Sequence, residues 1–261
     1  MKSYTIIIVL LSISLALLGC KDKDDDGNSY VPPINEDSAF TATFEISSLD
    51  SLMITATQYH VGKDSQIIVL CHQAGWSRGE YKEIAPKLNA MGYNCIAIDQ
   101  RSGGAVNGVT NETNARAKSA GKSTDFIDAK QDITATINWA KAYYGKDVIL
   151  WGSSYSSALA LIIAKENADV STVLAFSPGE YLVSFGVNVG NSMDGLDKPA
   201  FLTSSKAESD QTKLLFDRIV STNRVHFTPT GNGEHGSRAL WEEKADYQEY
   251  WTVLKAFLSS L

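Results

Sequence analysis

A serine-containing turn carries the clearest chemistry in the chain. The apolar run 147–151 leads into residues 152–156 (GSSYS), and an Ala/Leu/Ile-rich stretch begins at once. A strand that turns sharply into a helix presents its central hydroxyl at the sheet edge, above the helix N-terminus. In the register G-x-S-x-G that hydroxyl belongs to Ser154, and Ser156 stands where the pattern has its second glycine. The spacing therefore predicts that Ser154 is a nucleophile.

A nucleophilic serine needs a base, because its hydroxyl is barely reactive near neutral pH. Of the four histidines, His60 and His226 fall within strand patterns, which favours structural roles for them. His235 instead lies in the glycine-rich segment 231–236 (GNGEHG), between the last expected strand and the last expected helix. A histidine in such a loop can reach over a sheet edge, so His235 is the predicted base.

The elements that must position these residues alternate between strand and helix. An antiparallel opening pair is predicted at 40–46 and 52–61, and buried strands at 66–71, 94–98, 147–151, 171–176, 199–204 and 224–228. Helices are predicted at 80–91, 123–144, 155–166, 211–221 and 239–258, and 100–122 as a polar loop. This alternation predicts one α/β domain over 39–261, with a mostly parallel central sheet and helices on both faces.

Over residues 40–261 the chain resembles the α/β-hydrolase superfamily, in its small dienelactone-hydrolase-like branch. The resemblance rests on the turn at Ser154, on His235 and on a carboxylate between them, which is the order that the family uses. It implies an acid about nine residues after the proline that opens the strand at 199, which is Glu208. Asp210 stays open as the alternative acid. Only 54 residues (208 − 154) separate Ser154 from Glu208, so no large cap domain is expected.

The resemblance also implies an oxyanion hole after the strand at 66–71, where this chain reads HQAGW (72–76). Ala74 is the expected backbone donor, with Gln73 as the alternative, and the amide of Tyr155 is the second donor. Gln73 stands where the family usually has glycine. Trp76 is predicted either to line the substrate pocket or to pack beneath the loop.

These residues predict a serine hydrolase that cleaves a small or polymer-attached carboxylic ester through an acyl-enzyme. No cofactor is expected, because neither an HExxH metal motif nor a phosphate loop is present. Two alternatives use the same fold: a peptidase or thioesterase with the same three residues, and a non-catalytic lipoprotein that binds a ligand. A structural or adhesion module is a third class, and it would have no reactive serine.

The composition of the chain argues against nucleic acid as a partner and against a disulfide framework. The 261 residues carry a formal net charge of −7, so the basic excess needed for nucleic acid is missing. Three cysteines cannot build a disulfide framework, and Cys71 and Cys95 are predicted to be buried free thiols because neighbouring strands offset them. The oligomeric state is left open.

The N-terminus is predicted to be a targeting segment. An apolar run at 5–18 ends in Leu17-Leu18-Gly19-Cys20, which resembles the lipobox of bacterial lipoproteins. The resemblance implies a signal peptide at 1–19, an acylated Cys20 and an acidic, unfolded tether at 20–38. The chain is therefore expected to be an outer-membrane lipoprotein that faces the periplasm or the cell surface. The run KDKDDD (21–26) is either an export tag or a charged spacer.

Overall fold

The computed structural model describes residues 38–261. The predicted signal peptide, Cys20 and the tether up to residue 37 lie outside the described residues. Within 38–261, no helix combines the length and the apolar character that crossing a membrane requires.

The elements of the described chain follow one another in a regular order. The strands are β1 (Phe40–Ser47), β2 (Met53–His60), β3 (Ile67–Cys71), β4 (Asn94–Ile98), β5 (Ala105–Val106), β6 (Val109–Thr110), β7 (Val148–Ser153), β8 (Val170–Phe176), β9 (Ala200–Thr203) and β10 (Arg224–Phe227). The α-helices are α1 (Ile84–Ala90), α2 (Glu112–Ser119), α3 (Ala129–Tyr144), α4 (Tyr155–Glu166), α5 (Val189–Ser192), α6 (Ser209–Phe216) and α7 (Tyr247–Leu258). Short 3-10 turns cover Arg78–Tyr81, Val183–Phe185, Lys206–Glu208 and Ser237–Leu240.

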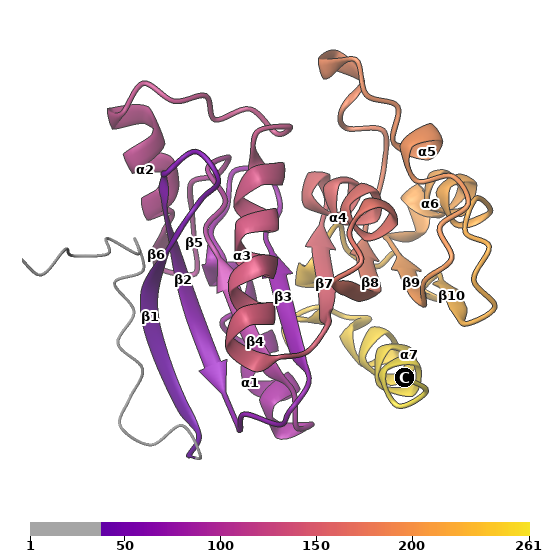
Figure 1. The fold of residues 1–261 in the computed structure, drawn as a ribbon. Helices are drawn as coiled ribbons and strands as arrows, with labels where there is room; N and C mark the ends of the chain where they lie inside the picture. Colours follow the sequence, from indigo (N-terminus) through magenta and orange to yellow (C-terminus); the bar gives the residue numbers. More distant parts are fainter. Residues whose placement is uncertain (1–37) are drawn as a thin grey trace, which may run out of the picture.

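Eight of the described strands form one sheet in the order β1-β2-β4-β3-β7-β8-β9-β10. The strands from β4 to β10 in this order run parallel, whereas β2 pairs antiparallel with both β1 and β4. The predicted fold class is therefore confirmed, including the antiparallel opening pair. Figure 1 shows the carboxyl ends of β3, β7, β8 and β9 pointing toward one edge of the sheet.

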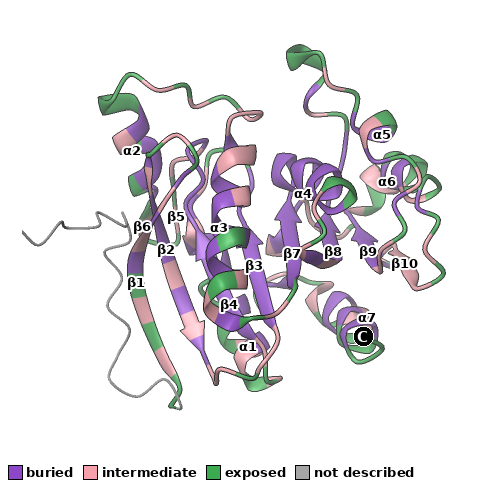
Figure 2. Ribbon diagram, in the orientation of Figure 1, coloured by how far each residue is buried: buried purple, intermediate pink, exposed green. Residues whose placement is uncertain are grey.

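The central strands are buried on both faces, and the residues of β3 show how the layers form. Ile67, Val69 and Cys71 join the core that contains α3 and α4, while Ile68 and Leu70 join the core that contains α1 and α7. Side chains alternate between the two faces of a strand, so a continuous apolar run fits a strand covered on both sides. Figure 2 shows this burial concentrated in β3, β7, β8 and α4.

The two described cysteines are buried free thiols, as predicted. Cys71 belongs to the core on the α3–α4 face, whereas Cys95 belongs to the core on the α1–α7 face. The sheet itself separates them, and burial raises the pKa of both thiols above their usual range.

Three predicted helices begin later in the structure than expected. The helix predicted at 123–144 begins at Ala129, and the one predicted at 211–221 ends early, at Phe216. The segment predicted as a helix at 80–91 divides into the 3-10 turn Arg78–Tyr81 and the helix α1. Pro86 lies in the first turn of α1, where its missing N–H leaves no helical acceptor unpaired. The segment predicted at 239–258 likewise divides, and α7 begins only at Tyr247.

The region 100–122, predicted as a loop, contains the hairpin β5–β6 and the helix α2. Asn111 caps α2, because its side chain accepts a 2.7 Å hydrogen bond from the amide of Asn114. The buried residues of α2 are Thr113, Asn114 and Ala117, so the helix lacks the apolar stripe by which a sequence reveals a helix.

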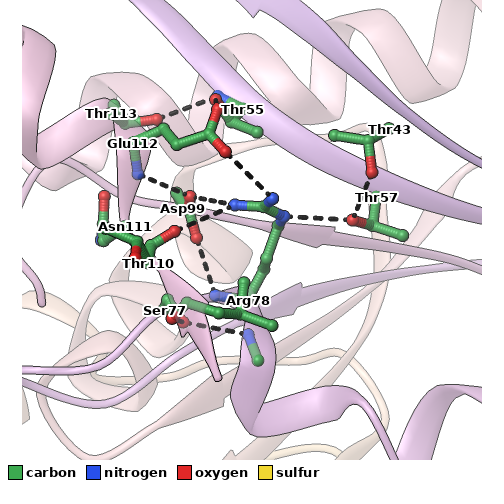
Figure 3. A network of polar contacts seen from close by, with 12 residues as sticks. Thr43, Thr55, Thr57, Ser77, Arg78, Asp99, Thr110, Asn111, Glu112 and Thr113 are labelled. Carbon is green, nitrogen blue, oxygen red and sulfur yellow. Dashed lines mark hydrogen bonds and ion pairs between the residues drawn. The ribbon is translucent and has the colours of Figure 1, made fainter. Parts of the chain in front are cut away.

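An ionic network holds α2 and the segment after β3 onto the sheet (Figure 3). The buried carboxylate of Asp99 pairs with the guanidinium of Arg78 and accepts the backbone amides of Arg78 (2.8 Å) and Glu112 (3.0 Å). Arg78 Nε donates to Thr57 Oγ1 of β2 at 3.1 Å. The start of the turn Arg78–Tyr81 is thus fixed to β2, to the end of β4 and to α2.

A second buried ion pair fixes the chain after β4. Arg101 is almost fully buried, and it pairs with the buried Asp132 of α3 (2.7 Å) and with Asp50 (2.9 Å). Ser48 Oγ donates to Asp132 Oδ1 at 2.7 Å, which supplies a further donor to the buried carboxylate. These contacts give the turn at 99–103 a structural role.

Candidate active site

Ser154 occupies a strained position between β7 and α4. Its backbone has φ 58° and ψ −124°, a conformation that residues with a side chain rarely adopt. Its amide donates to Phe176 O at 2.8 Å, which holds the turn against the end of β8. A Cβ atom at Gly152 would lie 2.4 Å from Ser157 Cα, so only glycine lets the strand and the helix approach this closely.

Ser156, which replaces the second glycine of the pattern, has a structural task. Its hydroxyl donates to His72 O at 2.5 Å and lies 2.5 Å from Gln100 Nε2, which donates to it. These bonds join the first turn of α4 to the loops after β3 and β4. The small size that the turn requires is kept, and the hydroxyl adds a link that glycine lacks.

The structure brings three of the predicted site residues together. His235 Nε2 lies 2.8 Å from Ser154 Oγ, and His235 Nδ1 lies 2.5 Å from Glu208 Oε1. Ser154 lies between the end of β7 and the start of α4. Glu208 is the last residue of the 3-10 turn after β9, and His235 lies in the loop after β10. Residues separated by up to 81 positions therefore meet at the carboxyl edge of the sheet.

The carboxylate of Glu208 is stabilised in its ionised form. Burial acts to raise its pKa, but hydrogen bonds from His235, Ser205 and Ser177 outweigh burial and lower the pKa to about 2. An ionised carboxylate only accepts hydrogen bonds, so Nδ1 of His235 carries the proton and Nε2 is free to accept from the Ser154 hydroxyl. The donors and acceptors of the three side chains are thus arranged so that His235 can take the serine proton.

Asp210, the alternative acid, does not join this group. It lies exposed in the first turn of α6, two residues beyond Glu208. The two carboxylates differ because Glu208 forms a capping box with Ser205, which directs its side chain back over the turn.

Ser177 is a supporting residue that sequence reasoning missed. Its hydroxyl donates to Glu208 Oε2 and accepts the amide of Gly236, both at 2.9 Å. One hydroxyl therefore ties the acid to the histidine loop. The hydroxyl of Tyr181, from the same connection, donates to Ser177 O at 3.0 Å. No motif in a single sequence marks either residue.

The lowered pKa of Glu208 predicts how stability depends on pH. Its folded pKa of about 2 lies below the ordinary 4.5, so the ionised group stabilises the fold above pH 4.5 and this stabilisation is lost as pH falls toward 2. We expect Glu208→Gln to lower the unfolding free energy by about 2 kcal/mol at pH 7 and by less than half of that at pH 3. Urea unfolding of both proteins at the two pH values measures the difference, and a deficit that grows at pH 3 contradicts the prediction.

The two loop amides predicted as alternative oxyanion donors after β3 differ in their surroundings. The backbone amide of Gln73, the alternative donor, already donates to Glu80 Oε2 at 2.8 Å. Ala74 is exposed at the tip of the loop, and Tyr155 begins α4 directly after Ser154. Of the two amides considered in this loop, that of Ala74 therefore fits the role better.

Buried side chains support this loop from below. His72 Nδ1 lies 2.8 Å from Gln73 O, and the amide of Gln100 donates to His72 Nε2 at 3.0 Å. Burial lowers the pKa of His72 to about 4, so it is neutral near pH 7. Trp76 stacks on Trp241 with ring centroids 5.3 Å apart, which places it in the packing beneath the loop and leaves it half-buried.

Glu80 is a residue beside the site to which sequence reasoning gave no role. It was expected at the start of a helix, and its side chain is completely buried. Burial raises its pKa to about 7, although hydrogen bonds from Ser153 and Gln73 oppose that rise.

Within residues 38–261, no cluster of three or more His, Cys, Asp or Glu residues could hold a metal ion.

Comparison with known proteins agrees with this fold. The profile of a family described as serine aminopeptidase, S33, matches residues 62–184. An esterase from Pyrococcus furiosus superposes with a TM-score of 0.66 at 21% identity, over 85% of this chain and 93% of that one. A dienelactone hydrolase from Anabaena variabilis gives a TM-score of 0.63 at 14% identity, over 87% and 99%. The esterase domain of a Rhodothermus marinus protein gives 0.58 at 14%, over 84% and 97%.

The chain therefore has the α/β-hydrolase fold, which these structural neighbours share. No large cap is evident in the described residues, because the connection from β8 to β9 holds only the turn Val183–Phe185 and the short helix α5. A search of the curated proteins finds no match.

Proposed function

We propose that this protein is a serine hydrolase that cleaves a carboxylic ester through an acyl-enzyme. The observation that carries the proposal is the continuous contact from Ser154 Oγ to His235 Nε2, and from His235 Nδ1 to Glu208 Oε1. The esterases and the dienelactone hydrolase among the structural neighbours support this class of reaction.

The proposed reaction has two halves. Ser154 Oγ attacks the ester carbonyl while His235 Nε2 takes the serine proton, and Glu208 stabilises the imidazolium. The amides of Ala74 and Tyr155 stabilise the negative oxygen of the tetrahedral intermediate. The intermediate collapses, His235 gives its proton to the departing alcohol, and Ser154 is left acylated. Water, deprotonated by His235, then releases the carboxylic acid and restores the serine.

A fluorophosphonate probe tests this proposal, because it phosphonylates only an activated serine. We expect one adduct per chain, located at Ser154 by peptide mass spectrometry, together with hydrolysis of p-nitrophenyl esters. A folded protein that neither reacts with the probe nor hydrolyses any ester of a graded chain-length series would favour the alternative of a non-catalytic, ligand-binding protein.

A peptidase is the second candidate, because the matching family is described as serine aminopeptidase. The same three side chains serve amide hydrolysis, so the choice depends on the leaving group. Parallel assays with p-nitrophenyl esters, acyl thioesters and aminoacyl p-nitroanilides separate esterase, thioesterase and peptidase by their kcat/KM values. We expect the esters to give the highest value.

We also propose that the protein is an outer-membrane lipoprotein, anchored through a lipid on Cys20 and facing the periplasm or the cell surface. The motif Leu17-Leu18-Gly19-Cys20 supports this proposal. Metabolic labelling with a fatty-acid analogue should mark the wild-type protein and not the variant Cys20→Ala. Protease treatment of intact cells distinguishes the two orientations.

A further inference from the structure

The carboxyl group of Glu80 lies behind the proposed active site and holds two of its segments directly. Glu80 Oε2 accepts the backbone amide of Gln73 at 2.8 Å, and Glu80 Oε1 accepts the Ser153 hydroxyl at 2.7 Å. Gln73 immediately precedes Ala74, and Ser153 immediately precedes Ser154. One buried carboxyl group therefore joins the oxyanion loop to the turn that carries the nucleophile.

Ser153 extends this connection to the histidine loop. Its oxygen accepts the amide of Ser237 at 2.9 Å, and Ser237 lies two residues after His235. Ser237 is fixed further by Trp151 Nε1 of β7, which donates to its hydroxyl at 2.8 Å. A Cβ atom at Gly236 would lie 2.6 Å from Ser153 Oγ, so the histidine loop presses closely on this link.

A carboxylate suits this position because it accepts hydrogen bonds and donates none. The Gln73 amide and the Ser153 hydroxyl, which contact the Glu80 carboxyl group, are both donors. With its hydrogen committed to Glu80, Ser153 turns a lone pair toward the Ser237 amide. Burial raises the pKa of Glu80, whereas these hydrogen bonds favour its ionised form.

We infer that Glu80 is a positioning residue that holds the oxyanion loop, the nucleophile turn and the histidine loop in their catalytic arrangement. The inference rests on the proposed function. By engaging the Gln73 amide, Glu80 fixes the peptide before Ala74 and leaves the Ala74 amide for the substrate. Because these groups act on the tetrahedral intermediate, the benefit falls on the transition state and not on substrate affinity.

The variant Glu80→Gln tests the inference at constant side-chain size. Its amide has one accepting oxygen, so its NH2 group must face one of the two donors or force the Ser153 hydroxyl to turn away. We expect kcat for a p-nitrophenyl ester to fall about 10- to 100-fold while KM changes less than 2-fold. An alkylboronic acid, which forms a tetrahedral adduct with an active serine, should bind more weakly by the factor by which kcat/KM falls.

Two further variants separate positioning from general damage. Glu83→Gln changes an exposed carboxylate three residues away and should keep wild-type kinetics. Ser153→Ala cuts the link to Ser237 but keeps the Gln73 contact, so it should lower kcat less than the larger change Glu80→Ala. Glu80→Gln and Ser153→Ala both disturb the contact between Glu80 and Ser153. The double variant Glu80→Gln/Ser153→Ala should therefore lose less activity than the product of the two single effects.

The outcomes distinguish this inference from the proposed function. A wild-type protein that reacts with fluorophosphonate, beside a Glu80→Gln variant with unchanged kcat and unchanged boronate affinity, overturns the positioning role and leaves the serine hydrolase intact. A variant that loses only folded protein, with normal rates per labelled serine, also overturns it. A wild type inert to probe and esters overturns both.

Discussion

Replacing Ser154 by alanine is expected to lower kcat for ester hydrolysis on the order of 10⁴- to 10⁶-fold. The hydroxyl supplies the attacking oxygen, and no neighbouring serine can take its place. Ser153 Oγ is engaged with Glu80 and Ser237, and the Ser156 hydroxyl is bonded to His72 O. The variant should retain its fold. Alanine takes the same backbone conformation, and the hydrogen bond from the amide of residue 154 to Phe176 O is kept.

Steady-state rates and fluorophosphonate labelling both check this prediction. Ser171→Ala is the matched control, since Ser171 lies near the start of β8, at the end of the strand away from the site. It should retain full rate and full labelling. Substantial ester hydrolysis by purified Ser154→Ala, free of contaminating esterase, would falsify the assignment of Ser154 as the nucleophile.

Replacing Glu208 by glutamine is expected to lower kcat about 10³- to 10⁴-fold. A neutral amide cannot stabilise the imidazolium that forms when His235 takes the serine proton. It can also donate to Nδ1, which would place the ring proton on Nε2, the atom that must accept from Ser154. Substrate affinity should change little, because Glu208 contacts His235, Ser205 and Ser177 and lies behind the histidine.

Asp210→Asn is the matched comparison for that variant. Asp210 is an exposed carboxylate two residues along the chain, so its loss should change kcat less than 2-fold. The pair of variants decides between the two acids that the sequence left open. If Asp210→Asn loses its activity while Glu208→Gln keeps it, the histidine is oriented by a different arrangement from the one described.

Local patterns predicted the sheet well because its central strands are buried on both faces. Continuous apolar runs such as that of β3 leave little freedom of interpretation. The helix α2 was missed because its inward residues are polar or small, so hydrophobic periodicity carries no signal there. Helix starts at α1 and α7 were placed too early because 3-10 turns precede both helices.

The same distinction applies to the site. Ser154 lies in a motif whose spacing reflects a local backbone requirement, and His235 lies in a glycine-rich loop, so both could be proposed from the chain alone. The resemblance favoured Glu208 over Asp210, and the capping box with Ser205 gives a physical reason for the difference between the two carboxylates. Glu80 was unpredictable, because the partners of its carboxyl, Gln73 and Ser153, lie 7 and 73 positions away.

The direction of β1 decides at which end of the sheet the chain enters the domain. Because β1 and β2 are antiparallel, and β2 and β4 are antiparallel, β1 runs in the same sense as the parallel strands. Phe40 therefore lies at the end of the sheet opposite Ser154, as Figure 1 shows for the start of β1. If Cys20 holds a bilayer as proposed, the tether joins the domain at the end of the sheet opposite the reactive residues. The point of attachment is therefore separated from Ser154 by the length of the strands.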